Sequence, residues 1–383
     1  MPYGYLITAV LATLCTLVAY TGPRRPFALG LLSLFLGVVY NEAPLAVFVV
    51  LGASVLASLG EPGLGSAVGW TGSALFLVTA VGLVALALRG SRTDRVIDAA
   101  LDEGLGGGWR AQAGSALPPR SRRAGWLGIF TVPWVFGRRG VERVADLSYG
   151  DAGMRNRLDL YRARKPRADA APGPVLIHLH GGALIRGRKN IEARSLLYRL
   201  AAEGWVCVSA NYRLSPRVGF PEHLIDVKKI LAWVREHGAQ YGADPAAIHL
   251  AGSSAGGMLA ALAALTPNDP AYQPGFEDVD TSVTAVVYLA GYYGAPTDDP
   301  YTPFAHLTSA APPFFVAHGS HDTLVSAEDA RRFVDRLRAA SAQPVVFAVL
   351  PGGQHSFDRF DSARFNAVVD GVRDFAAWIR ARG

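Results

Sequence analysis

A serine between closely spaced glycines is the feature of this sequence best suited to chemistry. Ser254 lies within Gly252–Ser253–Ser254–Ala255–Gly256, after an apolar run at 248–251 and before an Ala- and Leu-rich run at 258–265. In a sharp strand-to-helix turn, the residues two positions before and after the serine nearly touch, so both must be glycine. The pattern predicts that Ser254 is a nucleophile and that the Ala255 N–H stabilises a developing oxyanion. The alternative is a serine in a small-residue packing turn.

Apolar strands and helices alternate from Val141 to the end of the chain. This alternation predicts a mostly parallel sheet covered by helices on both faces, with the site at the carboxyl ends of the strands. We expect strands at 141–149, 157–161, 174–179, 206–210, 248–251, 283–289, 313–317 and 344–349, and helices at 192–203, 224–237, 258–265, 327–339 and 363–380.

A glycine pair ends the third of these strands, in His178–Leu179–His180–Gly181–Gly182–Ala183. Glycines allow the backbone to approach a substrate carbonyl and direct N–H groups at it. Gly181 and Gly182, together with Ala255, therefore predict an oxyanion hole. His180 is better explained as a structural anchor of this loop than as a catalytic base.

Three motifs together resemble the hormone-sensitive-lipase-like branch of the α/β-hydrolase fold, a group of carboxylesterases and lipases. They are His180–Gly181–Gly182–Ala183, Asn211–Tyr212–Arg213–Leu214–Ser215–Pro216 and Gly252–Ser253–Ser254–Ala255–Gly256. The resemblance covers residues 141–383 and implies an α/β-hydrolase fold for them. The sequence departs from the branch at two positions, because Ala183 replaces a frequent third glycine and Ser253 replaces a frequent aspartate.

The resemblance implies a catalytic triad in the order serine, acid, histidine, and the sequence supplies both remaining residues. Asp322 follows the apolar run at 313–317, and His355 follows the run at 344–349. In this interpretation His355 takes the proton from Ser254, while Asp322 orients the imidazole and stabilises its cation. Alternative histidines and acids close to these positions are His318, His321, Asp298 and Asp299.

The composition changes sharply at residue 88. Only four charged side chains precede that point, whereas the whole chain carries 37 basic and 31 acidic residues. Apolar runs lie at 5–20, 27–40, 44–59 and 66–88. A span needs about 20 apolar residues, so we expect residues 1–88 to form three or four membrane helices. A cleaved signal peptide is the alternative for the first run, but its N-terminal residues lack Lys and Arg.

Arginines flank the first and last apolar runs and indicate an orientation. Arg24 and Arg25 follow the first run, and Arg89, Arg92 and Arg95 follow the last. The excess of basic residues in cytoplasmic loops favours placing both groups in the cytoplasm. Three helices satisfy this preference and predict a cytoplasmic catalytic domain, whereas four would place one group outside.

Residues 89–140 form a basic connector between the two parts. This segment contains nine arginines, four acidic residues, and Trp109, Trp126 and Trp134. Arginine and tryptophan beside a membrane segment are typical of a surface at the lipid headgroups. The alternative is a cap packed on the catalytic domain at 141–383.

These observations predict a multi-pass membrane serine ester hydrolase with hydrophobic or lipid-like esters as substrates and the lipid bilayer as partner. An acyltransferase, a prenyl-protein methylesterase or an amidase could use the same triad, and a non-catalytic ligand-binding protein could share the fold. We expect no cofactor and no metal site, because His318, His321 and Asp322 lack a further ligand at useful spacing. The basic balance does not indicate nucleic-acid binding, since no basic and aromatic platform of a recognisable nucleic-acid fold is present.

Overall fold

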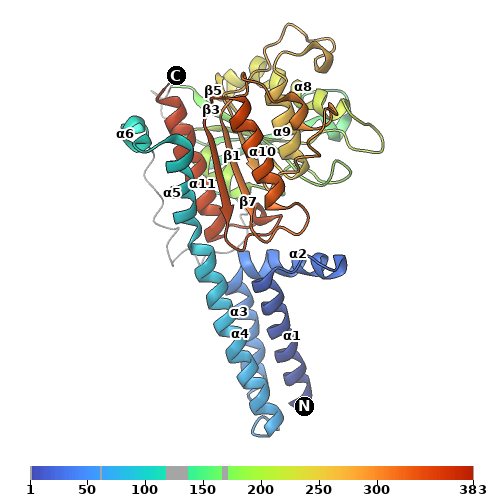
Figure 1. Ribbon diagram of the computed structural model, residues 1–383, viewed down its shortest axis with the longest axis vertical. Helices are drawn as coiled ribbons and strands as arrows, with labels where there is room; N and C mark the ends of the chain where they lie inside the picture. The colour runs from blue at the N-terminus through green and yellow to red at the C-terminus, as the bar shows by residue number, and fades with distance from the viewer. Residues whose placement is uncertain (1, 61–62, 118–136, 166–170, 383) are drawn as a thin grey trace.

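A helical bundle and an α/β domain make up the computed structural model, which describes residues 2–60, 63–117, 137–165 and 171–382 (Figure 1). The centre of the α/β domain is an eight-stranded sheet in the order β1-β2-β4-β3-β5-β6-β7-β8. The pairs β1–β2 and β2–β4 are antiparallel, and all later neighbours are parallel. The strands are β1 (Val141–Ser148), β2 (Arg157–Ala163), β3 (Gly173–Leu179), β4 (Val206–Ala210), β5 (Ala243–Ser253), β6 (Ala285–Leu289), β7 (Phe314–Gly319) and β8 (Val345–Leu350).

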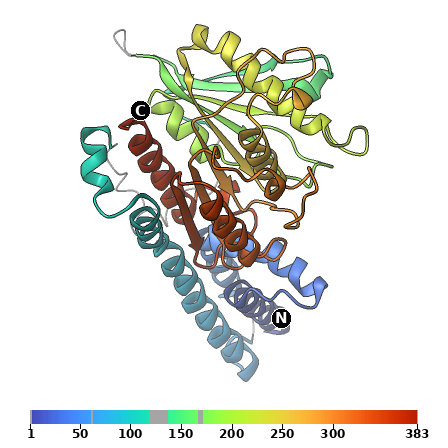
Figure 2. The same ribbon diagram turned by 45° about the horizontal axis from the view of Figure 1, so that its top comes forward.

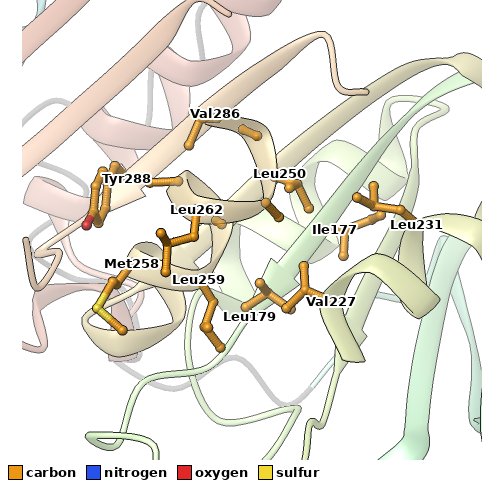
Figure 3. Close-up of a cluster of buried hydrophobic side chains, with 14 of the residues drawn as sticks. Ile177, Leu179, Val227, Leu231, Leu250, Met258, Leu259, Leu262, Val286 and Tyr288 are labelled. Carbon is orange, nitrogen blue, oxygen red and sulfur yellow. The ribbon is translucent and has the colours of Figure 1, made fainter. Parts of the chain in front are cut away.

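Helices cover both faces of this sheet, and each face has its own apolar core. One core contains side chains of α8 (Glu222–His237), α9 (Ala255–Leu265) and α10 (Ala327–Ala340). Figure 3 shows part of it, where Leu259 of α9 lies near Leu179 of β3 and Val227 of α8. The other core contains side chains of α5 (Thr93–Leu105), α7 (Arg194–Ala202) and α11 (Ala363–Arg380). The expected α/β-hydrolase fold is confirmed, with most strand and helix bounds within about two residues of those expected.

Short helical segments complete the domain. They are α6 (Trp109–Ala113) and 3-10 turns at Gly114–Ala116, Gly153–Asn156, Gly238–Tyr241, Pro270–Tyr272, Pro303–His306 and Phe357–Arg359.

The helices of the N-terminal region do not all run in one direction. The helices α1 (Pro2–Thr21), α3 (Pro44–Ser58) and α4 (Ala67–Ser91) run alongside one another, whereas α2 (Phe27–Glu42) lies across the end of this bundle, next to the α/β domain (Figures 1 and 2). The α2 and α3 axes differ by 91°. By length and composition, two helices of the described residues could cross a membrane, or three if the bent pair α2–α3 counts as one span.

The first part of the connector belongs to the α/β domain. Helix α5 follows α4 after a single residue and packs on β8 and α11. Trp109 is buried in the second core, where its indole Nε1 donates to Asp102 at 2.7 Å. This placement is that of a cap on the domain rather than of a headgroup-level tryptophan. Trp126 and Trp134 lie outside the described residues.

Candidate active site

Ser254 occupies a strained turn between β5 and α9. Its backbone has φ 55° and ψ −121°, a combination that non-glycine residues rarely adopt and that marks functional sites. A Cβ atom added to Gly252 would lie 2.2 Å from the Gly256 carbonyl oxygen, and one added to Gly256 would lie 2.2 Å from the Leu179 carbonyl oxygen. The first distance explains the glycine at position 252, and the second explains the glycine at position 256. The second shows that the turn packs directly against the end of β3.

The structure brings together the three residues expected to form the triad. Ser254 Oγ lies 2.8 Å from His355 Nε2, and His355 Nδ1 lies 2.7 Å from Asp322 Oδ2. These side chains follow β5, β8 and β7, three strands whose carboxyl ends share one edge of the sheet. The second carboxylate oxygen of Asp322 accepts the N–H groups of Leu324 and Val325, which fix the orientation of the carboxylate.

Electrostatic interactions within the triad favour an ionised Asp322 carboxylate beside a basic His355 imidazole. Burial alone would favour protonated Asp322, but His355 and hydrogen bonds from His318 and His355 hold the pKa of the Asp322 carboxyl below its usual value. Burial lowers the pKa of His355, but Asp322 reverses this effect and leaves the His355 pKa above its usual value. The pair is therefore suited to accept a proton on His355 and to stabilise the resulting cation.

The alternative residues occupy other positions. His318 is fully buried, and its Nε2 lies 3.2 Å from Asp322 Oδ2, the same oxygen that contacts His355. His321 packs against Gly22 of the helical bundle, where a Cβ added to the glycine would lie 2.5 Å from His321 Nδ1. Asp298 and Asp299 are exposed.

The glycine loop after β3 lies against Ser254. A Cβ added to Gly181 would be 3.1 Å from Ser254 Cβ, and Gly182 has φ 115°. However, the Gly181 N–H donates to the buried carboxylate of Glu192 at 2.6 Å. Of the expected oxyanion donors, Gly181 is therefore engaged by Glu192 in this structure. To stabilise an oxyanion, the Gly181 N–H would have to leave the Glu192 carboxylate and donate to the substrate oxygen instead.

His180 holds this loop in place. Its ring stacks on Tyr212 with centroids 4.4 Å apart, and the Tyr212 hydroxyl donates to the His180 carbonyl at 2.7 Å. Burial lowers the pKa of His180 to about 4, so its imidazole is neutral at physiological pH. These contacts are those of an anchor.

Two neighbouring carboxyl groups close to the site, the buried Asp358 and the partly buried Glu192, were not predicted from the sequence. Asp358 accepts a hydrogen bond from Ser253, whose Oγ also lies 3.1 Å from His178 Nε2. Burial and the nearby Glu192 raise the pKa of Asp358 to about 7. Asp358 thus places a carboxyl group against Ser253, the residue before the nucleophile, where the sequence departs from the hydrolase branch that it resembles. The only available sequence signal was that departure at Ser253.

Comparisons with known proteins agree with this geometry. The chain is 39% identical to a probable carboxylic ester hydrolase, LipM, of Mycobacterium tuberculosis, over 99% of this chain and 94% of that protein. It is 37% identical to the esterase LipQ of the same organism, over 82% and 81% of the two chains. Residues 158–298 match the BD-FAE family.

Solved structures support the fold. A thermophilic esterase of Thermogutta terrifontis, with butyrate bound, superimposes with a TM-score of 0.52 at 23% identity, over 62% of this chain and 93% of that one. The expected family and enzyme class are confirmed. The chain belongs to the family of carboxylic ester hydrolases that includes mycobacterial LipM and LipQ, and it has the α/β-hydrolase fold.

Proposed function

We propose that this carboxylic ester hydrolase is anchored in a membrane and cleaves hydrophobic esters through Ser254, His355 and Asp322. The observation that carries the proposal is the continuous hydrogen-bonded line from the Ser254 hydroxyl through His355 to Asp322, with separations of 2.8 Å and 2.7 Å. Few functions other than nucleophilic catalysis require a strained serine at the start of such a series of hydrogen bonds.

In the proposed reaction, the Ser254 oxygen attacks the ester carbonyl carbon while His355 Nε2 accepts the hydroxyl proton. The N–H groups of Ala255 and Gly182 stabilise the oxyanion, and Gly181 joins them when Glu192 releases its N–H. His355 then gives its proton to the departing alcohol, which leaves an acyl-enzyme. Water repeats the sequence, so that the acid is released and the Ser254 hydroxyl is restored.

Exposed apolar side chains around the site support hydrophobic substrates. In the described part of the chain beyond residue 91, the large apolar side chains that are exposed include Ile185, Tyr292 and Leu324. Each donates its backbone N–H to a residue of the site, respectively Gly182, Ser254 and Asp322. Exposed apolar side chains this close in the backbone to a catalytic centre favour substrates that bury acyl or alkyl groups.

The helical bundle supports membrane anchoring. Large apolar side chains cover its outside, Phe35, Trp70 and Leu77 among them. A surface of this kind is stable in hydrocarbon and costly in water. Helix α1 has 20 residues and α4 has 25, which at 1.5 Å per residue span about 30 Å or more.

The positions of the arginines support a cytoplasmic catalytic domain. Arg24 donates to the Ser320 carbonyl, and Arg89 donates to the Tyr20 carbonyl, so both basic groups lie at the end of the bundle nearest the catalytic domain. The chain reaches this end after α1 and again after α4. Three crossings with these arginines inside agree with the positive-inside preference.

Kinetics of Ser254→Ala test the catalytic proposal. We expect the full-length variant in detergent micelles to lose about 10³-fold or more in kcat on a p-nitrophenyl ester, with an unchanged melting temperature. Retention of near-parental activity would remove Ser254 from the nucleophile role.

Product analysis with added alcohols separates hydrolysis from acyl transfer. Labelling of intact cells with an impermeant fluorophosphonate tests on which side of the membrane the catalytic domain lies.

A further inference from the structure

The loop that carries His355 lies against helix α2 of the bundle. We propose that Gln354 is a positioning residue for the triad and that α2 holds it, so that the bundle is a working part of the catalytic centre as well as its anchor. The inference rests on the proposed role of His355 as the base. It assigns a task to α2, the helix that lies across the bundle (Figure 1).

Gln354 connects the loops of the acid and the base. Its side chain is fully buried, and its Oε1 accepts the N–H groups of Thr323 and His355, both at 3.1 Å. Thr323 follows Asp322 directly. One amide oxygen therefore fixes the backbone next to the acid relative to the backbone of the histidine.

Helix α2 contacts the other end of this amide. Gln354 Nε2 donates to the buried Ser33 Oγ at 3.4 Å. One turn further along α2, a Cβ added to Gly37 would lie 2.9 Å from Gln354 Cγ. Residues four apart share a helix face, so Ser33 and Gly37 form one small-residue surface that receives the Gln354 side chain.

Further contacts hold α2 and the histidine loop together. The Arg364 guanidinium pairs with Glu42 at the end of α2, and it also donates to the carbonyl of Pro351 at 3.0 Å. A Cβ added to Gly352 would lie 2.2 Å from Arg89 Nε of α4. The loop thus contacts two helices of the bundle as well as the catalytic domain.

These contacts couple the position of α2 to the alignment of the triad. A misplacement of about 1 Å in a catalytic group can lower the rate about 10²-fold. A change at the α2 surface should therefore reduce kcat while leaving KM nearly unchanged, because the ester-binding residues belong to other loops. Simple destabilisation would instead lower the melting temperature without this selective effect.

Gly37→Ala in the full-length enzyme tests the proposal. The added methyl must displace Gln354, so we expect kcat for p-nitrophenyl butyrate to fall about 10- to 100-fold, with KM within about twofold of the parental value. Gly52→Ala is the matched control, because a Cβ there meets nothing within 4 Å. It should retain parental kinetics.

A double-mutant cycle separates positioning from general damage. In a Gln354→Ala background the added methyl at Gly37 has no long side chain to displace, so Gly37→Ala should cause little further loss of kcat. An equal loss in both backgrounds, or parental kcat in the single variant, would overturn the proposal.

If Gly37→Ala does not fold, Ser33→Ala replaces it, and the exposed Ser58→Ala is its control. Ser33→Ala should lower kcat about two- to fivefold. Unchanged kcat in this variant would count against the proposal. Ser254→Ala in the same assay identifies failure of the proposed function itself, since only that failure leaves Ser254→Ala active.

Discussion

The helical bundle and the catalytic domain place apolar side chains in opposite environments. In α4, Trp70 and Leu77 are mostly exposed, whereas Leu259 of α9 and Phe314 of β7 are completely buried. Removing apolar surface from water stabilises a folded protein by about 25 cal/mol for each Å² that is buried. The domain therefore keeps its large apolar side chains inside, whereas the bundle carries many of them on its outside.

Buried polar groups show the same contrast. In the domain, one group of them lies at the catalytic edge and includes Asp322 and His355. In α2 they gather at the junction, where Ser33, Asn41 and Glu42 are buried against the domain or neighbouring helices. Since an unpaired buried polar group is costly, the members of each group are hydrogen-bonded to other side chains or to the backbone. Substitutions can distinguish the two groups, because some should lower activity and spare thermal stability, and others should do the reverse.

The largest expected effect is on catalysis alone. Asp322→Asn keeps the shape of the side chain but removes the charge that stabilises the His355 cation. We expect kcat to fall about 10³- to 10⁴-fold, with a nearly unchanged melting temperature. Steady-state kinetics of the full-length variant measure this. The exposed Asp298→Asn is the control, and comparable losses in both variants would contradict the assignment.

At the junction, where α2 meets the catalytic domain, we expect a substitution to affect stability rather than catalysis. Glu42→Ala leaves the Arg364 charge buried without its carboxylate partner, and both side chains are fully buried. Breaking such a pair costs about 3–5 kcal/mol, so the melting temperature in micelles should fall markedly. Asp329→Asn, at the exposed pair with Arg332, should cost less than about 1 kcal/mol. Similar thermal stability of the two variants would show that the junction contributes little.

A matched pair of leucine substitutions tests the contrast in apolar placement. Leu259→Ala opens a cavity in the domain core and should cost about 2–5 kcal/mol. Leu77→Ala removes an exposed side chain of α4 and should cost less than about 1 kcal/mol in micelles. Unfolding curves of both full-length variants provide the comparison, and equal losses would mean that Leu77 is buried against protein in solution.

The smallest expected effect is in the pH dependence. His355 must be neutral to accept a proton, and Asp322 raises its pKa. The kcat/KM value should therefore decrease below an apparent pKa higher than the usual value of about 6.5, by about tenfold per pH unit. A profile with an acid limb well below pH 6.5 would contradict this electrostatic role.

Local patterns were sufficient to predict much of the domain. The glycine spacing around Ser254 reflects contacts between adjacent residues, and the apolar periodicity of the strands reflects burial in one sheet. Both are visible in a short window of sequence. The family resemblance implied that an acid and a histidine follow Ser254, and the ends of two later strands supplied Asp322 and His355.

Long-range contacts were not predictable in this way. The run 27–40 is mostly apolar, and nothing in it marked Gly37 and Ser33 as a surface for Gln354, some 320 residues away. Glu192 and Asp358 lie in unrelated segments and meet only in the folded chain. Trp109 lies in a basic segment, yet it enters the core because α5 packs on β8.

Identification of the residue modified by a fluorophosphonate tests the central claim most directly. The full-length enzyme in micelles is incubated with the reagent, and the modified peptide is located by mass spectrometry. We expect a single adduct on Ser254, which is lost in Ser254→Ala and forms much more slowly in His355→Ala. An adduct on another residue, or undiminished labelling of either variant, would contradict the account.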